Sequence, residues 1–358
     1  MQISKGEVSH LLIERQERFH SESEAVYEAG LGSSPWQQVD HTETRVDGQN
    51  QHCQVVCNPV YTSYHTQPRK DRLSVLDVLR QGRKRIFRLN REALDILQQV
   101  PLSKAAQAIL PEWCSEQDWE EADFVERLDQ ALPNLNVQQR TAILGAAAVA
   151  TYHAEQGVLV VDTLVCDDAA QFHWLTRALM LCWVHDGRLY KKLAPVIALH
   201  REQLQNFRKR YWEYYHQLLA YRRTPNADQR LQLETGFDEL FATHTGYADL
   251  DRRIEKTRAK KEALLQVLEH PELPLHNNAS ELAVRQRVRK RDVSFGPRSP
   301  LGVKAWDTFA TLADTARKLG ISFYAYIQDR ISEANQIPPL ATLVSERAAE
   351  LKLGASWA

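Results

Sequence analysis

The sequence has no long hydrophobic run, because no stretch approaches the ~18 consecutive apolar residues of a membrane-spanning helix. Its N-terminal segment also lacks an apolar run after its basic residues, so we expect no secretory signal peptide. There are five cysteines, an odd number, and no two of them are spaced as Cys-x-x-Cys. Neither a disulfide framework nor a zinc knuckle is therefore expected. Together these absences predict a soluble protein of the reducing cytosol, without a membrane partner.

An excess of charge of either sign is absent as well. The chain has 45 Lys and Arg residues against 46 Asp and Glu residues, which gives a net charge of −1. Any contact with nucleic acid must then come from local basic patches, because the chain as a whole is not basic. The hydrophobic content is 43% of 358 residues, which is enough for a core, and the length favours two or three modules.

Turn signals and β-branched or aromatic residues predict three antiparallel strands within residues 36–68. Asp47-Gly48 is a hairpin turn signal, and Asn58-Pro59 marks a second tight turn. Further along, the apolar run Leu164–Cys166 is typical of a strand buried on both faces, and two aspartates follow it. We expect a helix to begin almost at once, from Ala169.

Most of the remaining chain has helical periodicity, including residues 3–29, and there is no strand signal between Lys192 and His276. These patterns predict an α/β fold in seven parts. They are an N-terminal helical segment (1–35), a core in three parts (36–82, 157–192 and the C-terminal helices 276–332), two helical insertions (83–156 and 193–275) and a C-terminal tail (333–358).

Three acidic residues fall where separate elements of such a fold could bring them together. Asp40 lies in the first strand, Asp167 follows the later strand, and Glu281 begins a late helix. Phosphoryl transfer by two metal ions needs carboxylates that converge on ions ~3.5–4 Å apart. The placement suits this chemistry, but it is not specific in a chain with 46 acidic residues.

Three sequence blocks sharpen this interpretation. The first is QQVDHTETRVDGQNQHCQVVCNP, with Asp-x-Thr-x-x-x-x-x-Gly at Asp40, Thr42 and Gly48. The second is LVCDDAAQFHWLTRALMLCWVHDGRLYKKL, with Cys-Trp-x-His at Cys182, Trp183 and His185. The third has its marked positions at Asn277, Asn278, Glu281, Arg285, Phe295, Ser299, Thr315, Ala316, Gly320, Tyr324 and Tyr326. In this order, and over most of residues 36–331, the blocks resemble those of the insertion-sequence-sixty-six transposases.

The resemblance implies an RNase H-like fold, a mixed sheet with large helical insertions. It also implies that Asp40, Asp167 and Glu281 form the Asp-Asp-Glu triad of a metal-dependent polynucleotidyl transferase and hold two Mg²⁺ (or Mn²⁺) ions. Such an enzyme cleaves phosphodiester bonds at transposon ends and transfers the strand to target DNA. The implied partners are double-stranded DNA, both transposon ends and target, and further copies of the chain, in the bacterial cytosol.

The chain departs from the family pattern at three positions. His41-Thr42 stands where Glu-Thr is usual, and Glu281-Leu282 stands where Glu-Arg is usual, so Arg285 must serve alone. Asp167-Asp168 replaces Asp-Gly, which leaves open which aspartate is the second ligand. We assign Asp167, because it aligns with the acid of the family.

Two groups of basic residues are candidates for phosphate contacts. Arg285, Arg289, Lys290 and Arg291 belong to a basic run, with Arg287, that follows the third acid. Such a run is usually a solvated helix face, but its place beside the proposed triad favours contact with DNA. Arg208 and Arg210 lie in the second insertion. The aromatic residues next to them, Trp212, Tyr214 and Tyr215, either pack internally or stack on bases.

Local structural roles compete with the catalytic ones. Asn278 and Glu281 fit a capping box, and Glu281 and Arg285 are spaced for a helix ion pair. Asp167 and Asp168 fit a turn and a helix cap, while Asp40 fits an exposed strand position. Cys182 and His185 could share a metal, but no second Cys/His pair is near. A structural role beside the site is favoured for these two residues, and Asn277 and Asn278 are further supporting residues.

Two other functions remain open from the sequence. A structure-specific nuclease would use the same fold and acids without transposition. A truncated or domesticated DNA-binding or assembly factor would need no catalysis. An intact triad argues against the second alternative, and the absence of a recognisable upstream DNA-binding region argues for it.

Overall fold

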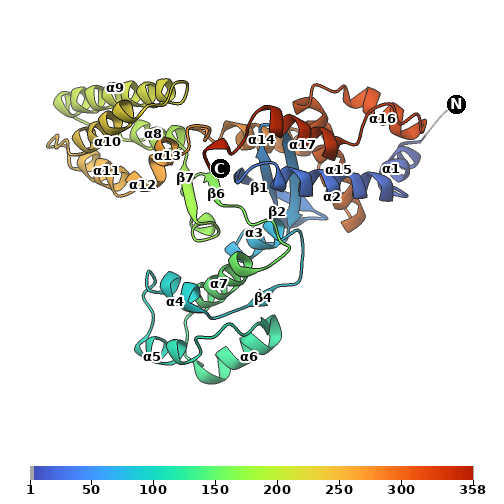
Figure 1. Ribbon diagram of the computed structural model, residues 1–358, viewed down its shortest axis with the longest axis horizontal. Helices are drawn as coiled ribbons and strands as arrows, with labels where there is room; N and C mark the ends of the chain where they lie inside the picture. The colour runs from blue at the N-terminus through green and yellow to red at the C-terminus, as the bar shows by residue number, and fades with distance from the viewer. Residues whose placement is uncertain (1–3, 358) are drawn as a thin grey trace. The chain divides into compact units, whose positions relative to one another are not determined.

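The computed structural model describes residues 4–357, and its central feature is a mixed sheet of five strands (Figure 1). Strand order is β3-β2-β1-β6-β7. β1 pairs with β2 antiparallel, whereas β1 with β6 and β6 with β7 are parallel pairs. The strands are β1 Trp36–Val46, β2 Gln49–Asn58, β3 Tyr61–Gln67, β6 Thr163–Cys166 and β7 Ala178–Leu181.

The predicted strand positions within residues 36–68 and at Leu164–Cys166 are confirmed. β1 and β2 are joined by the two-residue turn that the sequence indicates. Asp47 and Gly48 both have positive φ, 48° and 76°, as a type I′ turn requires, and this turn matches the twist of the strands on either side. Register is thereby set from the turn, with Val46 opposite Gln49 and Asp40 opposite Val55.

The helix expected directly after Ala169 is wrong. A short 3₁₀ helix, Ala170–Phe172, is followed by strand β7 and only then by helix α8, Trp183–Lys191. The β7 sequence ALML has good helix propensity, but Leu179 and Leu181 pair with β6. Pairing in the sheet overrides local propensity here, because it satisfies the backbone and buries apolar side chains at once.

The chain divides into two compact units, of which one contains the sheet. Within the described residues this first unit comprises the chain up to Thr66, Thr163–Asp168, and everything from Ala178. Helix α14, Asn278–Ser294, contacts β1 and β2 in this unit. The unit also contains α8 and the helices α1 Lys5–Ile13, α2 Glu17–Gly32, α9 Ala198–Tyr221, α10 Ala227–Phe241, α11 Ala248–Arg258, α12 Lys261–Leu264, α13 Gln266–Glu269, α15 Pro300–Lys318, α16 Phe323–Ile331 and α17 Leu340–Glu350.

The single helix expected at residues 3–29 is two helices, α1 and α2, and its first residue lies outside the described ones. Arg15, between them, has a φ of 58°, which interrupts a helix. From α9 to α13 the chain is helical without a strand among the described residues, as its periodicity predicts. α12 and α13 contact β7.

Trp183 anchors the helices α9 to α13 to the start of α8. Its side chain is fully buried, and its indole N–H donates to the Leu264 carbonyl at 2.8 Å. Around it lie the rings of Tyr211, Tyr214 and Phe237. This aromatic cluster is the core of the helical segment.

The second unit comprises residues 67–162 and 169–177. Its helices are α3 Arg72–Leu79, α4 Arg91–Leu97, α5 Lys104–Glu112, α6 Glu121–Ala131 and α7 Val137–Ala154, with a two-stranded sheet of β4 Ile86–Phe87 and β5 Trp119–Glu120. The alanine-rich helix α7 is central, because it contacts α3, α4 and β4. Its small side chains, Ala146–Ala150 among them, are almost all buried and let its neighbours approach closely.

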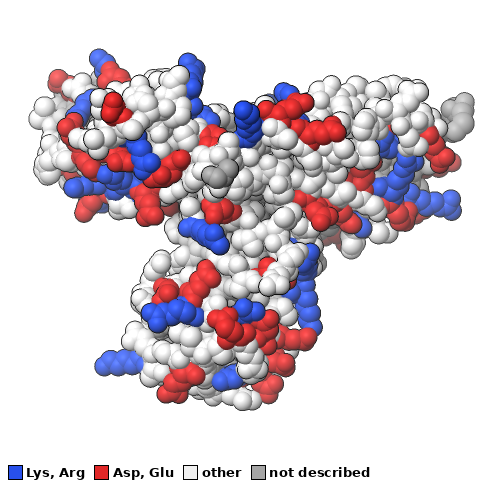
Figure 2. All heavy atoms as spheres, viewed as in Figure 1, with Lys and Arg blue, Asp and Glu red and all other residues white. Residues whose placement is uncertain are grey.

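Basic and acidic side chains are mixed on the surface. Figure 2 shows Lys and Arg interspersed with Asp and Glu over the visible face of each unit, which agrees with the net charge of −1. No helix within residues 4–357 is long and apolar enough to cross a membrane.

Gly30 of helix α2 packs closely against Tyr61 of β3. A Cβ added there would lie 2.5 Å from the ring of Tyr61. That ring is fully buried and its hydroxyl donates to Gln37 Oε1 at 2.9 Å, so it has little room to move. We predict that Gly30→Ala lowers stability by about 1–3 kcal/mol, the usual effect of overpacking. Chemical denaturation measures the change.

Gly236→Ala is the matched control, because this glycine is also helical but an added Cβ would meet Tyr214 at an ordinary 3.5 Å. It should be neutral or slightly stabilising, since alanine has the higher helix propensity. Equal effects of the two substitutions would contradict the tight contact of α2 with β3.

Candidate active site

Parallel pairing of β1 with β6 brings the first two acids to the same level of the sheet. Gln38 lies opposite Val165, and Asp40 and Asp167 are each two residues further on. Side chains two residues apart on a strand lie on the same face. The register alone therefore puts these two carboxyl groups on neighbouring segments, at the end of β6.

The carboxyl group of Asp40 has a strongly raised pKa. Burial raises this pKa to about 7. The backbone N–H of His41 donates to Asp40 Oδ1 at 2.7 Å, which lowers the pKa and so opposes the rise. Repulsion from the carboxylates of Asp167 and Glu281 contributes further to the raised pKa. Asp40, on β1, thus interacts electrostatically with Asp167, at the end of β6, and with Glu281, on α14.

Asn277 fastens the start of helix α14 to strand β1. Its side-chain amide donates to the Val39 carbonyl at 2.8 Å, and Gln38 donates to its Oδ1 at 3.3 Å. Asn277 is only 1% exposed. It occupies the N-cap position of α14 but makes no side-chain cap. The side chain joins the helix to the sheet, and Glu281 follows in the first turn.

Glu281 does not form the capping box that its sequence allows, because the N-cap is Asn277 rather than Asn278 and receives no side-chain bond. Nor is its ion-pair partner Arg285. Instead Arg188 of α8 donates to its Oε2 at 3.3 and 3.4 Å, and His185 Nδ1 lies 3.4 Å from its Oε1. Both local structural interpretations of Glu281 are therefore wrong.

Cys182, His185 and Glu281 have ligand atoms within 4.8 Å of one another, and no other such trio of Cys, His, Asp or Glu residues exists among the described ones. The Cys182 sulfur accepts from the backbone N–H groups of His185 (3.4 Å) and Asn277 (3.3 Å). Burial raises the pKa of this thiol, and these N–H groups oppose the rise. The spacing of Cys182 and His185 in the sequence indicates that they lie close together, but it does not predict that Glu281 lies beside them.

Sequence reasoning missed Arg188. It is three residues after His185, so a helix beginning near Cys182 puts both side chains on one face. That spacing within the second block could have identified it. In the structure it forms an ion pair with the third acid at 3.3 Å.

The two adjacent aspartates have different surroundings. Asp168 forms an ion pair with Lys260, beside helix α12. Asp167 is the one whose charge acts on Asp40. This difference supports Asp167 as the second acid of the candidate site.

The basic run of α14 is not uniform. Arg287 is 1% exposed, donates to Asp307 Oδ1 at 2.7 Å and lies 3.7 Å above the ring of Trp306, so it is a core residue rather than a surface one. Arg285, Arg289 and Lys290 are exposed. Arg291 donates to the Glu43 carbonyl of β1.

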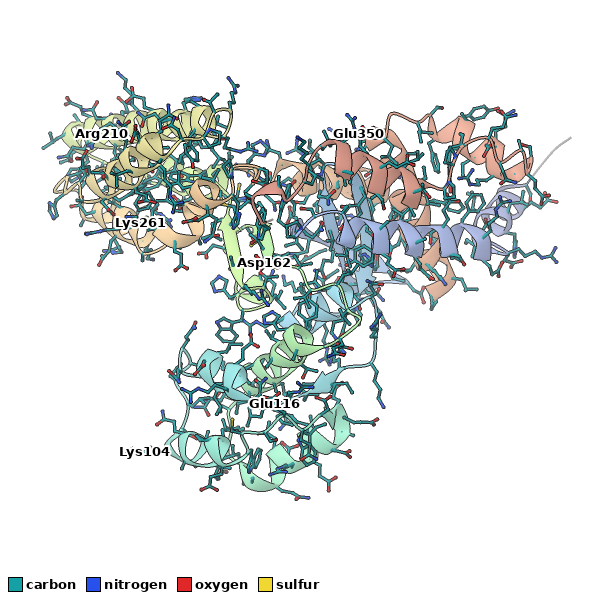
Figure 3. All side chains as sticks on the ribbon, in the orientation of Figure 1. Lys104, Glu116, Asp162, Arg210, Lys261 and Glu350 are labelled. Carbon is teal, nitrogen blue, oxygen red and sulfur yellow. The ribbon has the colours of Figure 1, made fainter. Side chains whose placement is uncertain are left out.

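In the segment α9–α13, packing explains the aromatic residues. Tyr214 and Tyr215 are buried, and Tyr214 lies against Trp183, so they offer no stacking surface for bases. Arg210 is exposed and donates to Thr243 Oγ1 at 3.2 Å (Figure 3). Arg208 is half-buried.

Comparison with known proteins gives two matches. A family model described as "Transposase IS66 family" matches residues 144–305, a range that includes Asp167, Cys182, His185 and Glu281. A protein of Sinorhizobium fredii (strain NBRC 101917 / NGR234), named "Uncharacterized protein y4jO", is 33% identical over 321 residues, which cover 89% of this chain and 99% of that protein. No solved structure matches the chain.

Asn277 provides a test of how the third acid is held. We predict that Asn277→Ala destabilises the protein by about 1–3 kcal/mol, because the Val39 carbonyl and the Gln38 amide lose a buried partner. Hydrogen exchange should become faster in the first turn of α14. Asn278→Ala is the control, because Asn278 is exposed, and it should change stability by no more than about 0.5 kcal/mol. Equal exchange rates in both variants would contradict the role of Asn277.

Proposed function

Because this chain belongs to the transposase IS66 family, we propose that it cleaves phosphodiester bonds at the ends of a transposon and joins the freed ends to target DNA. The observation that carries the proposal is the electrostatic coupling of Asp40 with Asp167 and Glu281, three acids from separate segments. Two transposon ends need two such sites, and a symmetric homo-oligomer of the chain would supply them.

The proposed fold of the catalytic part is RNase H-like. Its support is the order β3-β2-β1-β6-β7, in which an antiparallel hairpin, β1–β2, continues into two parallel pairs. Helix α14, which carries the third acid, contacts β1 and β2. β1 also pairs with β6, so the elements that carry the second and third acids are both neighbours of β1, which carries the first.

The proposed cofactors are two Mg²⁺ or Mn²⁺ ions held by Asp40, Asp167 and Glu281. Carboxylate oxygens are the ligands that Mg²⁺ prefers. The donor set fits such ions, because all three residues are carboxylates and repulsion from Asp167 and Glu281 contributes to the raised pKa of Asp40, which bound cations would relieve. Bound divalent ions would activate the attacking oxygen and stabilise the leaving oxygen.

The protein's own side chains position the acids and the DNA. The sheet fixes Asp40 and Asp167, while Asn277 fixes the start of α14. Arg285 and Arg289 follow Glu281 at intervals of four residues and therefore lie on the same face of the helix. Both are exposed, and their guanidinium groups suit the phosphates on either side of the cleaved bond.

The second acid is tested by comparing neighbours. Asp167→Ala should abolish Mg²⁺-dependent cleavage of DNA that carries the transposon ends, because it removes a ligand. Asp168→Ala should keep much of the activity, since it removes the ion pair with Lys260 and no proposed metal ligand. The measurement is the rate of end cleavage and strand transfer in vitro.

The reverse result would move the assignment to Asp168. Cleavage of branched or unrelated DNA without any strand transfer would favour a structure-specific nuclease instead. Full activity of both variants would overturn the catalytic triad.

The DNA contacts are tested by salt dependence. Each neutralised phosphate changes the log-log slope of affinity against salt by about 0.9. We therefore expect Arg285→Ala/Arg289→Ala to flatten this slope by about 1.8, and Arg208→Ala/Arg210→Ala to flatten it by a similar amount. Lys104→Ala, in the second unit, is the control and should leave it unchanged (Figure 3). An unchanged slope in an arginine variant would remove that pair from the DNA interface.

A further inference from the structure

The trio of Cys182, His185 and Glu281 offers three kinds of donor at one point, a sulfur, a nitrogen and an oxygen, all within 4.8 Å of one another. We propose that these residues bind one transition-metal ion of the zinc class. This site is additional to the proposed triad and rests on the proposed function only in sharing Glu281.

Two of the donor atoms have no hydrogen-bond partner. His185 Nδ1 and Glu281 Oε1 are both buried and unsatisfied, although they lie 3.4 Å apart. Buried polar atoms without partners are rare in proteins, and a bound ion can supply the contact that such atoms lack. Nitrogen and oxygen ligands at ~2.0–2.1 Å from a tetrahedral ion are about 3.3–3.4 Å apart. The observed separation of 3.4 Å matches this value.

The three side chains are also held in place by their neighbours. Cys182 is the N-cap of helix α8, and its sulfur accepts the backbone N–H of His185 there. The same sulfur also accepts the backbone N–H of Asn277. Arg188 holds Glu281 Oε2 and leaves Oε1 directed at His185. Partners of this kind orient ligands and tune metal affinity. The site is therefore organised before any ion binds.

The donor set decides which ion fits. Thiolate and imidazole ligands select zinc-class ions, whereas Mg²⁺ prefers oxygen ligands alone. Three protein ligands leave a fourth, tetrahedral position open, as in zinc sites that bind water. The His185 side chain is 35% exposed, although its Nδ1 atom is buried.

Co²⁺ is the probe, because its visible absorption reports tetrahedral geometry and its charge-transfer band reports a sulfur ligand. We expect the metal-free chain to bind one equivalent of Co²⁺ with both features. Zn²⁺ should displace it, and an excess of Mg²⁺ should not. Cys182→Ser should lose the sulfur band. His185→Ala should weaken Co²⁺ binding at least about 10-fold, the lower end of the loss seen for outer-shell partners.

The exposed Cys114 provides the matched control, and Cys114→Ser should keep the sulfur band. His185→Ala removes a half-exposed side chain, so it tests the site even if Cys182→Ser fails to fold. A sulfur band that persists in Cys182→Ser, or unchanged affinity in His185→Ala, would overturn the proposal.

Asp40→Asn separates this site from the proposed triad. It should lose DNA cleavage and keep the Co²⁺ spectrum, because Asp40 is not one of the three ligands. Loss of the spectrum in Asp40→Asn would place the ion on the triad and overturn the additional site. Absence of the sulfur band in a wild-type chain that still cleaves DNA with Mg²⁺ would overturn the site and leave the proposed function intact.

Discussion

The hydrogen bonds of Asn277 join helix α14 to strand β1, and the position of Glu281 depends on them. The amide of Asn277 donates to the Val39 carbonyl, one residue before Asp40, so the first and third acids are tied through a single side chain. Its backbone N–H reaches the Cys182 sulfur, which connects α8 to the same point. β6 then adds the second acid through its parallel pairing with β1. One buried asparagine thus links three of the segments on which the candidate site is built.

Glu281 stands between two different chemical surroundings. On one side is the carboxylate of Asp40, which repels it, and on the other are Arg188 and His185, which lie 3.3 and 3.4 Å from its oxygens. The oxygen-rich side suits Mg²⁺ and the side with sulfur and nitrogen suits zinc-class ions. The proposed triad and the proposed additional site thus follow from the same side chain.

Features that depend on nearby residues could be predicted from the sequence, and features that depend on distant pairing could not. The Asp47-Gly48 turn and the strands around it follow from local turn chemistry. β7 could not be recognised, because its residues favour a helix and only the pairing with β6 makes them a strand. The three acids could be named from the family resemblance. The spacing of His185 and Arg188 puts them on one face of α8, but it does not show that this face meets Glu281 of α14. Arg287 was grouped with a surface run, yet it is four residues after the buried Ala283, and that interval indicates the core face.

The place of the second unit in the chain has a consequence for biosynthesis. Residues 67–162 separate β3 from β6, so the β1–β6 pairing joins parts of the chain far apart in sequence. During N-to-C synthesis β1 has its partner β2 early, but its other edge stays open until the intervening unit has emerged. Contacts of such long sequence separation form slowly, and an unpaired strand edge invites association with other chains. Compaction of residues 67–162 around the alanine-rich α7 as they emerge would shorten the time for which the β1 edge is exposed.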